Sequence, residues 1–132
     1  MSERQPGAPD DELPDSPSAK QVMRYYELVD ANDVTGLVDL FTADAVYHRP
    51  GYQPLRGRDE LMRFYTDERV ISSGHHTVTT MVLSGSQAAV NGEFSGSLRD
   101  GREVSLRFAD FFAIGPEGRF CRRDTFFFAP MV

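Results

Sequence analysis

The chain has 132 residues, of which 40% are hydrophobic and 26% charged, the length and balance of one globular domain. One cysteine excludes a disulfide scaffold and a cysteine-based zinc site, and the net charge of −6 disfavours a groove for nucleic acid. No apolar run approaches the roughly 20 residues of a membrane span, and the start lacks a signal-peptide segment. We therefore predict a cytoplasmic protein without membrane contact.

The first part of the chain is acidic and rich in proline. Residues 1–15 bury too little apolar area to offset chain entropy, so we predict a disordered acidic tail before one domain over residues 16–132. The Ser16 hydroxyl then caps a helix with Pro17 at its first position. Its apolar stripe is Val22, Tyr25, Tyr26 and Val29.

A second helix and a third helix are predicted before residue 70. The second is short, starts at the Asn32–Asp33 cap and ends at Asp44. A loop rich in proline and glycine precedes the third. The expected elements are a helix containing Leu37, Leu40 and Phe41, a strand over Ala45–His48, a loop over Arg49–Gly57 and a helix from Arg58 to about Asp67.

After Gly74 the apolar residues recur with a period of two, which indicates strands joined by short turns. The expected strands are His76–Leu83, Gln87–Leu98, Glu103–Ile114 and Phe120–Ala129. Three helices followed by long strands predict an α+β fold. To bury both apolar faces, a curved antiparallel sheet with a mixed edge must wrap around the helices as a conical, cystatin-like barrel.

One strand carries a carboxyl group on an apolar face. Alternation places Asp110 beside Val104, Leu106, Phe108, Phe112 and Ile114. An unpaired carboxylate is costly there, so we predict that Asp110 keeps its proton and acts as a hydrogen-bond donor or proton carrier. The structural alternative is an aspartate bound to a backbone amide, Arg107 or Arg123.

Histidine, tyrosine and a helix-end aspartate are further candidates for acid–base chemistry. His48 ends the short strand, and His76 opens the sheet, where it is expected to point inward. Tyr25 needs a hydrogen-bond partner if buried, and Asp30 needs one because it opposes the helix dipole. Packing and solvated-turn roles stay open for them. His76 shares its parity with Val78, Thr80 and Val82.

Absent motifs decide the cofactor prediction, and an apolar residue on the outer face of the sheet decides the partner prediction. GxGxxG, Walker, HExxH and GxSxG patterns are absent, and three histidines without clustered acids do not make a metal site. We predict no cofactor and no metal. Phe111 lies on the outer face of the sheet, through which a homodimer is expected.

A resemblance to a known family is carried by residues 24–65, RYYELVDANDVTGLVDLFTADAVYHRPGYQPLRGRDELMRFY, and by the later segments RFADFF and TFFF. These residues resemble the nuclear transport factor 2-like superfamily, in particular its ketosteroid isomerase and SnoaL-like polyketide cyclase branch. The resemblance covers Ala19 to Pro130. It implies a fold that hosts isomerases, cyclases, dehydratases, epoxide hydrolases and binding proteins.

The isomerase pattern places its oxyanion tyrosine on Tyr25 and its protonated aspartate on Asp110, a carboxylic acid kept neutral by an apolar site. Its general-base aspartate falls on Arg49, after His48, and arginine is not a base at neutral pH.

Two other branches imply different residues. The pattern of bile-acid and scytalone dehydratases implies Tyr25 together with His76 as the base, oriented by Asp30. The Asp–Arg–Asp set of limonene epoxide hydrolase falls on Asn91, Glu93 and Thr125, with Asp124 adjacent.

These observations predict a cofactor-independent acid–base enzyme, an isomerase, dehydratase or cyclase, that acts on a hydrophobic polyketide-type or steroid-like carbonyl compound. The alternatives are a non-catalytic protein that binds a hydrophobic ligand or dimerises, and an epoxide hydrolase. The candidate catalytic residues are Asp110, Tyr25, His76, Asp30 and His48. The candidate substrate contacts are Arg49, Phe64, Asn91, Glu93, Phe108, Phe112 and Arg123.

Overall fold

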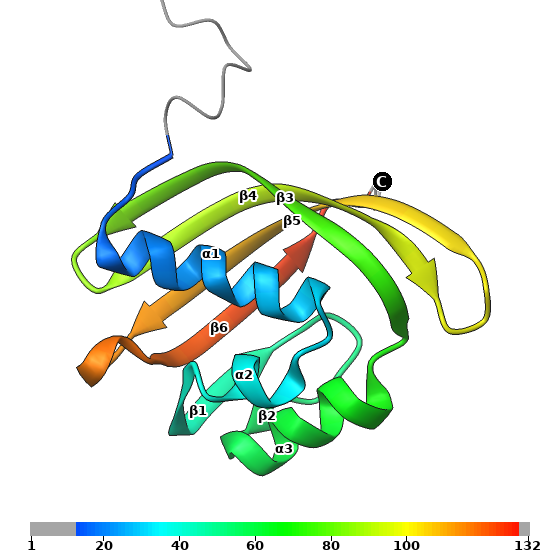
Figure 1. The fold of residues 1–132 in the computed structure, drawn as a ribbon, viewed down its shortest axis with the longest axis horizontal. Helices are drawn as coiled ribbons and strands as arrows, with labels where there is room; N and C mark the ends of the chain where they lie inside the picture. The colour runs from blue at the N-terminus through cyan, green and yellow to red at the C-terminus, as the bar shows by residue number, and fades with distance from the viewer. Residues whose placement is uncertain (1–12, 130–132) are drawn as a thin grey trace, which may run out of the picture.

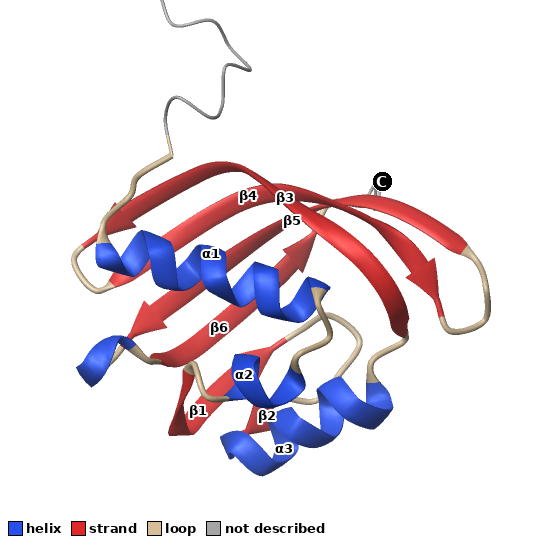
Figure 2. Cartoon of the chain, viewed as in Figure 1, coloured by secondary structure: helices blue, strands red, loops and turns tan. Residues whose placement is uncertain are grey.

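A computed structural model describes residues 13–129; residues 1–12, which make up most of the expected acidic tail, and residues 130–132 lie outside the described part. Six strands form one sheet in the order β2-β1-β6-β5-β4-β3, and the helices cover one face of it (Figures 1 and 2). The expected α+β class is confirmed. The sheet curves but does not close, because β2 and β3 are its two free edges.

The strand pairing is antiparallel throughout except between β1 and β6, which run parallel. The helices are α1 (Pro17–Asp30), α2 (Val34–Val38) and α3 (Gly57–Arg63), which continues as a π-helical turn (Phe64–Glu68). The strands are β1 (Phe41–His48), β2 (Leu55–Arg56), β3 (Ile71–Ser84), β4 (Gln87–Leu98), β5 (Glu103–Ile114) and β6 (Phe120–Phe127). A 3-10 turn (Pro116–Gly118) joins β5 to β6.

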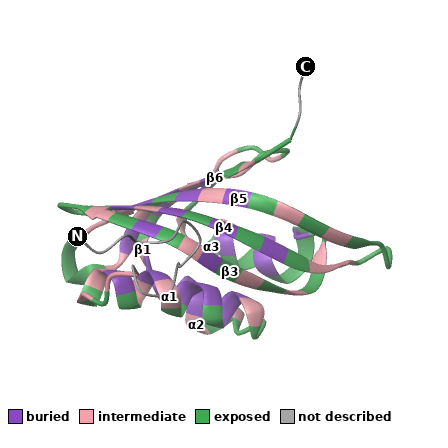
Figure 3. Ribbon diagram, turned by 90° about the horizontal axis from the view of Figure 1, so that it is seen from above, coloured by how far each residue is buried: buried purple, intermediate pink, exposed green. Residues whose placement is uncertain are grey.

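Helix α1 begins as the sequence predicts. The Ser16 hydroxyl accepts a hydrogen bond from the Ala19 amide, and Pro17 takes the first helical position. The predicted stripe faces the sheet, and all four of its residues are buried. Figure 3 shows buried residues on the side of the helices that faces the sheet.

The second helix is shorter than expected, and the strand after it is longer. Helix α2 ends at Val38, and Phe41 already belongs to β1, where it pairs with Phe120. The reason is tertiary: the Phe120 amide donates to the Leu40 carbonyl, and the Arg58 guanidinium donates to the Phe41 carbonyl. These bonds hold Phe41 in the sheet and Leu40 in the turn before it, despite their helical spacing.

Strand β3 begins at Ile71, five residues before the expected start, and its alternation is interrupted. The register against β4 shifts between Val78 and Thr80. Val78 is therefore buried while Thr80 and Val82 are exposed, which corrects the prediction that all three share a face.

The opposite face of the sheet exposes aromatic rings. Phe111 and Phe126 are each about half exposed there and contact each other edge to face. The expected homodimer through this face stays a prediction. Among residues 13–129, no helix has the length and apolar character needed to cross a membrane.

Candidate active site

A histidine and an aspartate meet where α1 ends against β3. The His76 Nδ1 atom lies 2.6 Å from Asp30 Oδ1, and the His76 amide donates to Asp30 Oδ2 at 2.9 Å. These bonds are the partners that a carboxylate at a helix C-terminus needs. Since a carboxylate accepts, Nδ1 carries the proton, and Nε2 of the neutral ring is left as a base.

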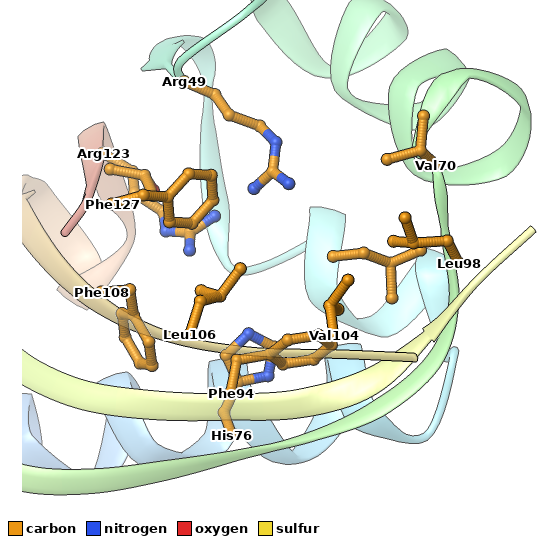
Figure 4. A pocket seen from close by; sticks show the side chains of 12 residues that line it. Arg49, Val70, His76, Phe94, Leu98, Val104, Leu106, Phe108, Arg123 and Phe127 are labelled. Carbon is orange, nitrogen blue, oxygen red and sulfur yellow. The ribbon is translucent and has the colours of Figure 1, made fainter. Parts of the chain in front are cut away.

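The ring of His76 lines a cavity of about 210 Å³ on the concave face of the sheet (Figure 4). The cavity lies where β3 and β5 begin and β4 and β6 end. Its polar lining comes from His76, Arg49, Arg123 and Thr125. Its apolar wall consists of Val70, Ile71, Phe94, Leu98, Val104, Leu106, Phe108 and Phe127.

Burial makes His76 a neutral base. It lowers the pKa of the His76 ring, and the hydrogen bond and charge of Asp30 raise the pKa only in part. The charges of Arg123 and Arg69 lower it further. The ring is therefore neutral at pH 7 and can accept a proton.

Asp110 is fully buried, as its strand parity predicts, but it has partners that the prediction lacked. Arg123 Nη2 donates to its carboxylate at 2.9 Å, Tyr26 donates at 2.5 Å, and Thr125 donates as well. All three are donors, so none of these contacts needs a proton on Asp110. The arrangement matches the structural alternative of an aspartate bound to Arg123 and differs from the predicted donor.

Tyr25 is also buried, and its hydroxyl is committed to other side chains. It shares a hydrogen bond with the Tyr65 hydroxyl and accepts another from Arg123 Nη1 at 2.6 Å. Tyr25 and Asp110 therefore do not line the cavity, although the sequence predicted them as catalytic residues within it. Both are connected to it through Arg123, whose guanidinium they hold, and Asp110 also through Thr125.

Two predicted substrate contacts and one candidate base lie on the outer face of the sheet. Asn91 and Glu93 are exposed there, because alternation along β4 turns them away from Val90 and Phe94. His48 binds Asp124 at 2.9 Å, and its neighbour Tyr47 takes the inward position. The structure therefore does not bring His48, Asn91 or Glu93 into the cavity.

Of the three predicted aromatic substrate contacts, one lies at the cavity. Phe108 lines the cavity, whereas Phe64 and Phe112 are fully packed in the core. Phe64 contacts Tyr47, Tyr52 and Tyr65, and its ring holds Arg49 from one side. Phe64 and Phe112 thus pack in the core next to the site and do not line the cavity.

Several residues of the site were not predicted from the sequence. Tyr26 lies on the predicted apolar stripe and was detectable as a second inward phenol. The sequence pattern did not place Tyr47, Tyr65 and Arg69 in the site, because their proximity depends on how β1 and the π-helical turn pack together. Arg69 is buried, which lowers the pKa of its guanidinium.

Comparison with known proteins agrees with this fold. A model of the SnoaL-like domain matches residues 22–123, and the chain therefore belongs to the SnoaL-like domain family of the NTF2-like superfamily. A curated relative, the orange carotenoid-binding protein of Synechocystis sp., is 29% identical over 101 residues. That match spans 74% of this chain and 32% of the relative, so the chain corresponds to about a third of that protein.

Solved structures share the fold. SalBIII, an epoxide hydrolase/cyclase-like enzyme in pyran ring formation in polyether salinomycin, superposes with a TM-score of 0.75 at 19% identity, covering 84% of this chain and 90% of its own. An NTF2-like protein of Burkholderia pseudomallei gives 0.78 at 20% identity, covering 86% and 92%. One from Exiguobacterium gives 0.72 at 19%, covering 83% and 99%.

Proposed function

We propose that the protein is a cofactor-independent acid–base enzyme in which His76 removes a proton next to the carbonyl group of a small apolar substrate. The observation that carries the proposal is the 2.6 Å contact between His76 Nδ1 and Asp30 at the wall of an apolar cavity. It fixes the tautomer that leaves Nε2 basic. Isomerisation, dehydration and cyclisation all begin with this step.

The proton balance of the step is simple. The substrate C–H bond breaks, the proton moves to His76 Nε2, and the electron pair forms an enolate with its charge on the former carbonyl oxygen. Protonated His76 then returns the proton to a different carbon, which isomerises the substrate, or to a leaving hydroxyl, which releases water. Asp30 stabilises the imidazolium in between.

Arg123 is the proposed stabiliser of the enolate oxygen. Its guanidinium lines the cavity, and its Nε is buried without a hydrogen-bond partner among the described residues. Asp110, Tyr25 and Tyr65 hold the terminal nitrogens, so the Nε–H donor is preorganised. Asp110 and Tyr25 act here as positioning residues.

Proton–deuterium exchange tests this proposal. Wild-type protein would be incubated in heavy water with a panel of β-hydroxy and β,γ-unsaturated carbonyl compounds and followed by NMR. We expect deuterium incorporation next to the carbonyl, lost in His76→Gln. His48→Gln is the matched control, because His48 also binds an aspartate but lies on the outer face. Equal exchange in wild type and His76→Gln would overturn the proposal.

A second candidate function is binding of a hydrophobic ligand without catalysis. The apolar wall of the cavity favours it, as does the similarity to the orange carotenoid-binding protein. In this case the exchange assay shows no difference between any variant and buffer, while an apolar ligand copurifies with the protein and is detected by mass spectrometry after extraction.

A further inference from the structure

Buried positive charge exceeds buried negative charge at one end of the cavity. Arg69 and Arg123 are buried there and Arg49 is half-buried, and Asp110 is the carboxylate that pairs with Arg123. Within residues 13–129, no ion pair joins a carboxylate to Arg49 or Arg69. Among the described residues, the positive charge of this site is therefore not fully compensated.

Arg49 and Arg123 both line the cavity, and Arg49 is the one without a carboxylate partner among residues 13–129. In Figure 4 its guanidinium enters the cavity from the end of β1, with His76 across from it. The guanidinium lies 5.1 Å from the ring centre of Phe127 and 5.6 Å from that of Phe64, so aromatic faces hold it in place. Arg49 Nη1 donates to the Tyr47 hydroxyl at 3.3 Å.

The remaining donors of Arg49 are not used by the described part of the chain. Its Nε is buried and lacks a hydrogen-bond partner among residues 13–129. A half-buried charge with a buried, unused donor is costly, and a guanidinium matches a carboxylate in shape and charge. Arg123 differs, because Asp110 already balances its charge.

We propose that Arg49 binds a carboxylate of the ligand, so that the protein takes small apolar carboxylic acids. The carboxylate lies at Arg49, and the apolar body of the ligand extends along the wall toward His76. A cavity of about 210 Å³ suits a short chain or a single ring better than a four-ring steroid. Placing the reactive carbon at His76 rests on the proposed function, whereas the carboxylate site does not.

Calorimetric titration with a charged ligand and its neutral counterpart tests this site. The probes are 4-phenylbutanoate and 4-phenylbutanamide, which differ in charge but little in shape. We expect wild type to bind the carboxylate about tenfold or more tightly than the amide, as a charge-assisted hydrogen bond implies. Arg49→Met keeps the apolar stem and should lose this preference, while Arg49→Lys should retain part of it.

Arg107→Met is the matched control, because Arg107 is exposed on the outer face and the variant removes the same charge. It should keep the preference. The thermal unfolding midpoint of Arg49→Met should not fall, since the variant removes a half-buried charge that has no carboxylate partner among residues 13–129; a large fall assigns Arg49 a structural role and contradicts the proposal. Equal affinity of wild type for both probes, or no carboxylate binding in the millimolar range, would also overturn it.

Failure of this proposal is distinguishable from failure of the proposed function. His76→Gln should keep the carboxylate preference whether or not His76 is a base. A carboxylate preference without proton exchange supports the site and rejects the catalysis. Proton exchange without a carboxylate preference supports the catalysis and rejects the carboxylate site.

Discussion

Arg123 and Asp110 form a closed ion pair, with 2.9 Å between Arg123 Nη2 and the Asp110 carboxylate and almost no solvent exposure of either side chain. Removing one partner of such a pair leaves the other charge buried and unpaired. We expect Asp110→Asn to lower the free energy of unfolding by about 3–5 kcal/mol, measured by urea denaturation. Asp100→Asn is the control, because it breaks an exposed pair with Arg102 and should change little. Similar small losses in both variants would contradict a buried pair.

The buried ring of His76 makes stability depend on pH. Its pKa is lowered in the folded state, so the unfolded chain takes up the proton first as the pH falls below about 6.5. Stability contributed by the neutral ring is thus complete above that pH and falls below it, until the lower folded-state pKa is reached. The slope is at most about 1.4 kcal/mol per pH unit.

Denaturation of wild type and His76→Gln between about pH 8 and pH 5 measures this effect, with the difference between the two proteins as the readout. The wild type should lose more stability on acidification than His76→Gln. Parallel curves for the two proteins would show that His76 does not enter the fold as a neutral ring.

The sequence predicted the burial of Asp110 and named Arg123 only as one of several alternatives for its partner. Parity along β5 depends on one strand alone, whereas the approach of Arg123 depends on the register between β5 and β6, which sets Asp110 opposite Thr125. Asn91 and Glu93 were misplaced for a similar reason: they came from alignment to another branch, and the parity of β4 contradicts it.

The His76–Asp30 contact follows from the dehydratase resemblance, which covers both segments. The rest of the cavity wall was not predicted, because Val70, Leu98 and Phe127 are far apart in the sequence: Val70 precedes β3, Leu98 ends β4 and Phe127 ends β6. Their proximity is set by the curvature of the sheet. The helical spacing of Leu37, Leu40 and Phe41 also led to a wrong prediction, because backbone hydrogen bonding to β6 outweighs the local helix propensity there.

Gly92 shapes the cavity by letting the ring of Phe108 lie against β4. A Cβ atom at position 92 would lie 2.7 Å from Phe108 Cζ and 2.5 Å from the Thr77 carbonyl oxygen. We expect Gly92→Ala to push Phe108 into the cavity and to cost about 1–3 kcal/mol of stability. Calorimetry with 4-phenylbutanoate should show weaker binding. Gly115→Ala, whose new Cβ has its nearest neighbour at 3.5 Å, should leave binding unchanged; equal effects would argue against this role.

In the proposed mechanism Asp30 holds His76 as a base at the cavity wall, and an NMR titration of the His76 ring measures this interaction. His75 Nδ1 also lies 3.5 Å from Asp30, so the titration is run in a His75→Gln background with and without Asp30→Asn. The charge and hydrogen bond of Asp30 raise the pKa of His76, against burial and the charges of Arg123 and Arg69. Asp30→Asn should therefore lower the His76 pKa further, with no response in the His48 signals. A His76 titration that does not respond to the loss of Asp30 would contradict the account.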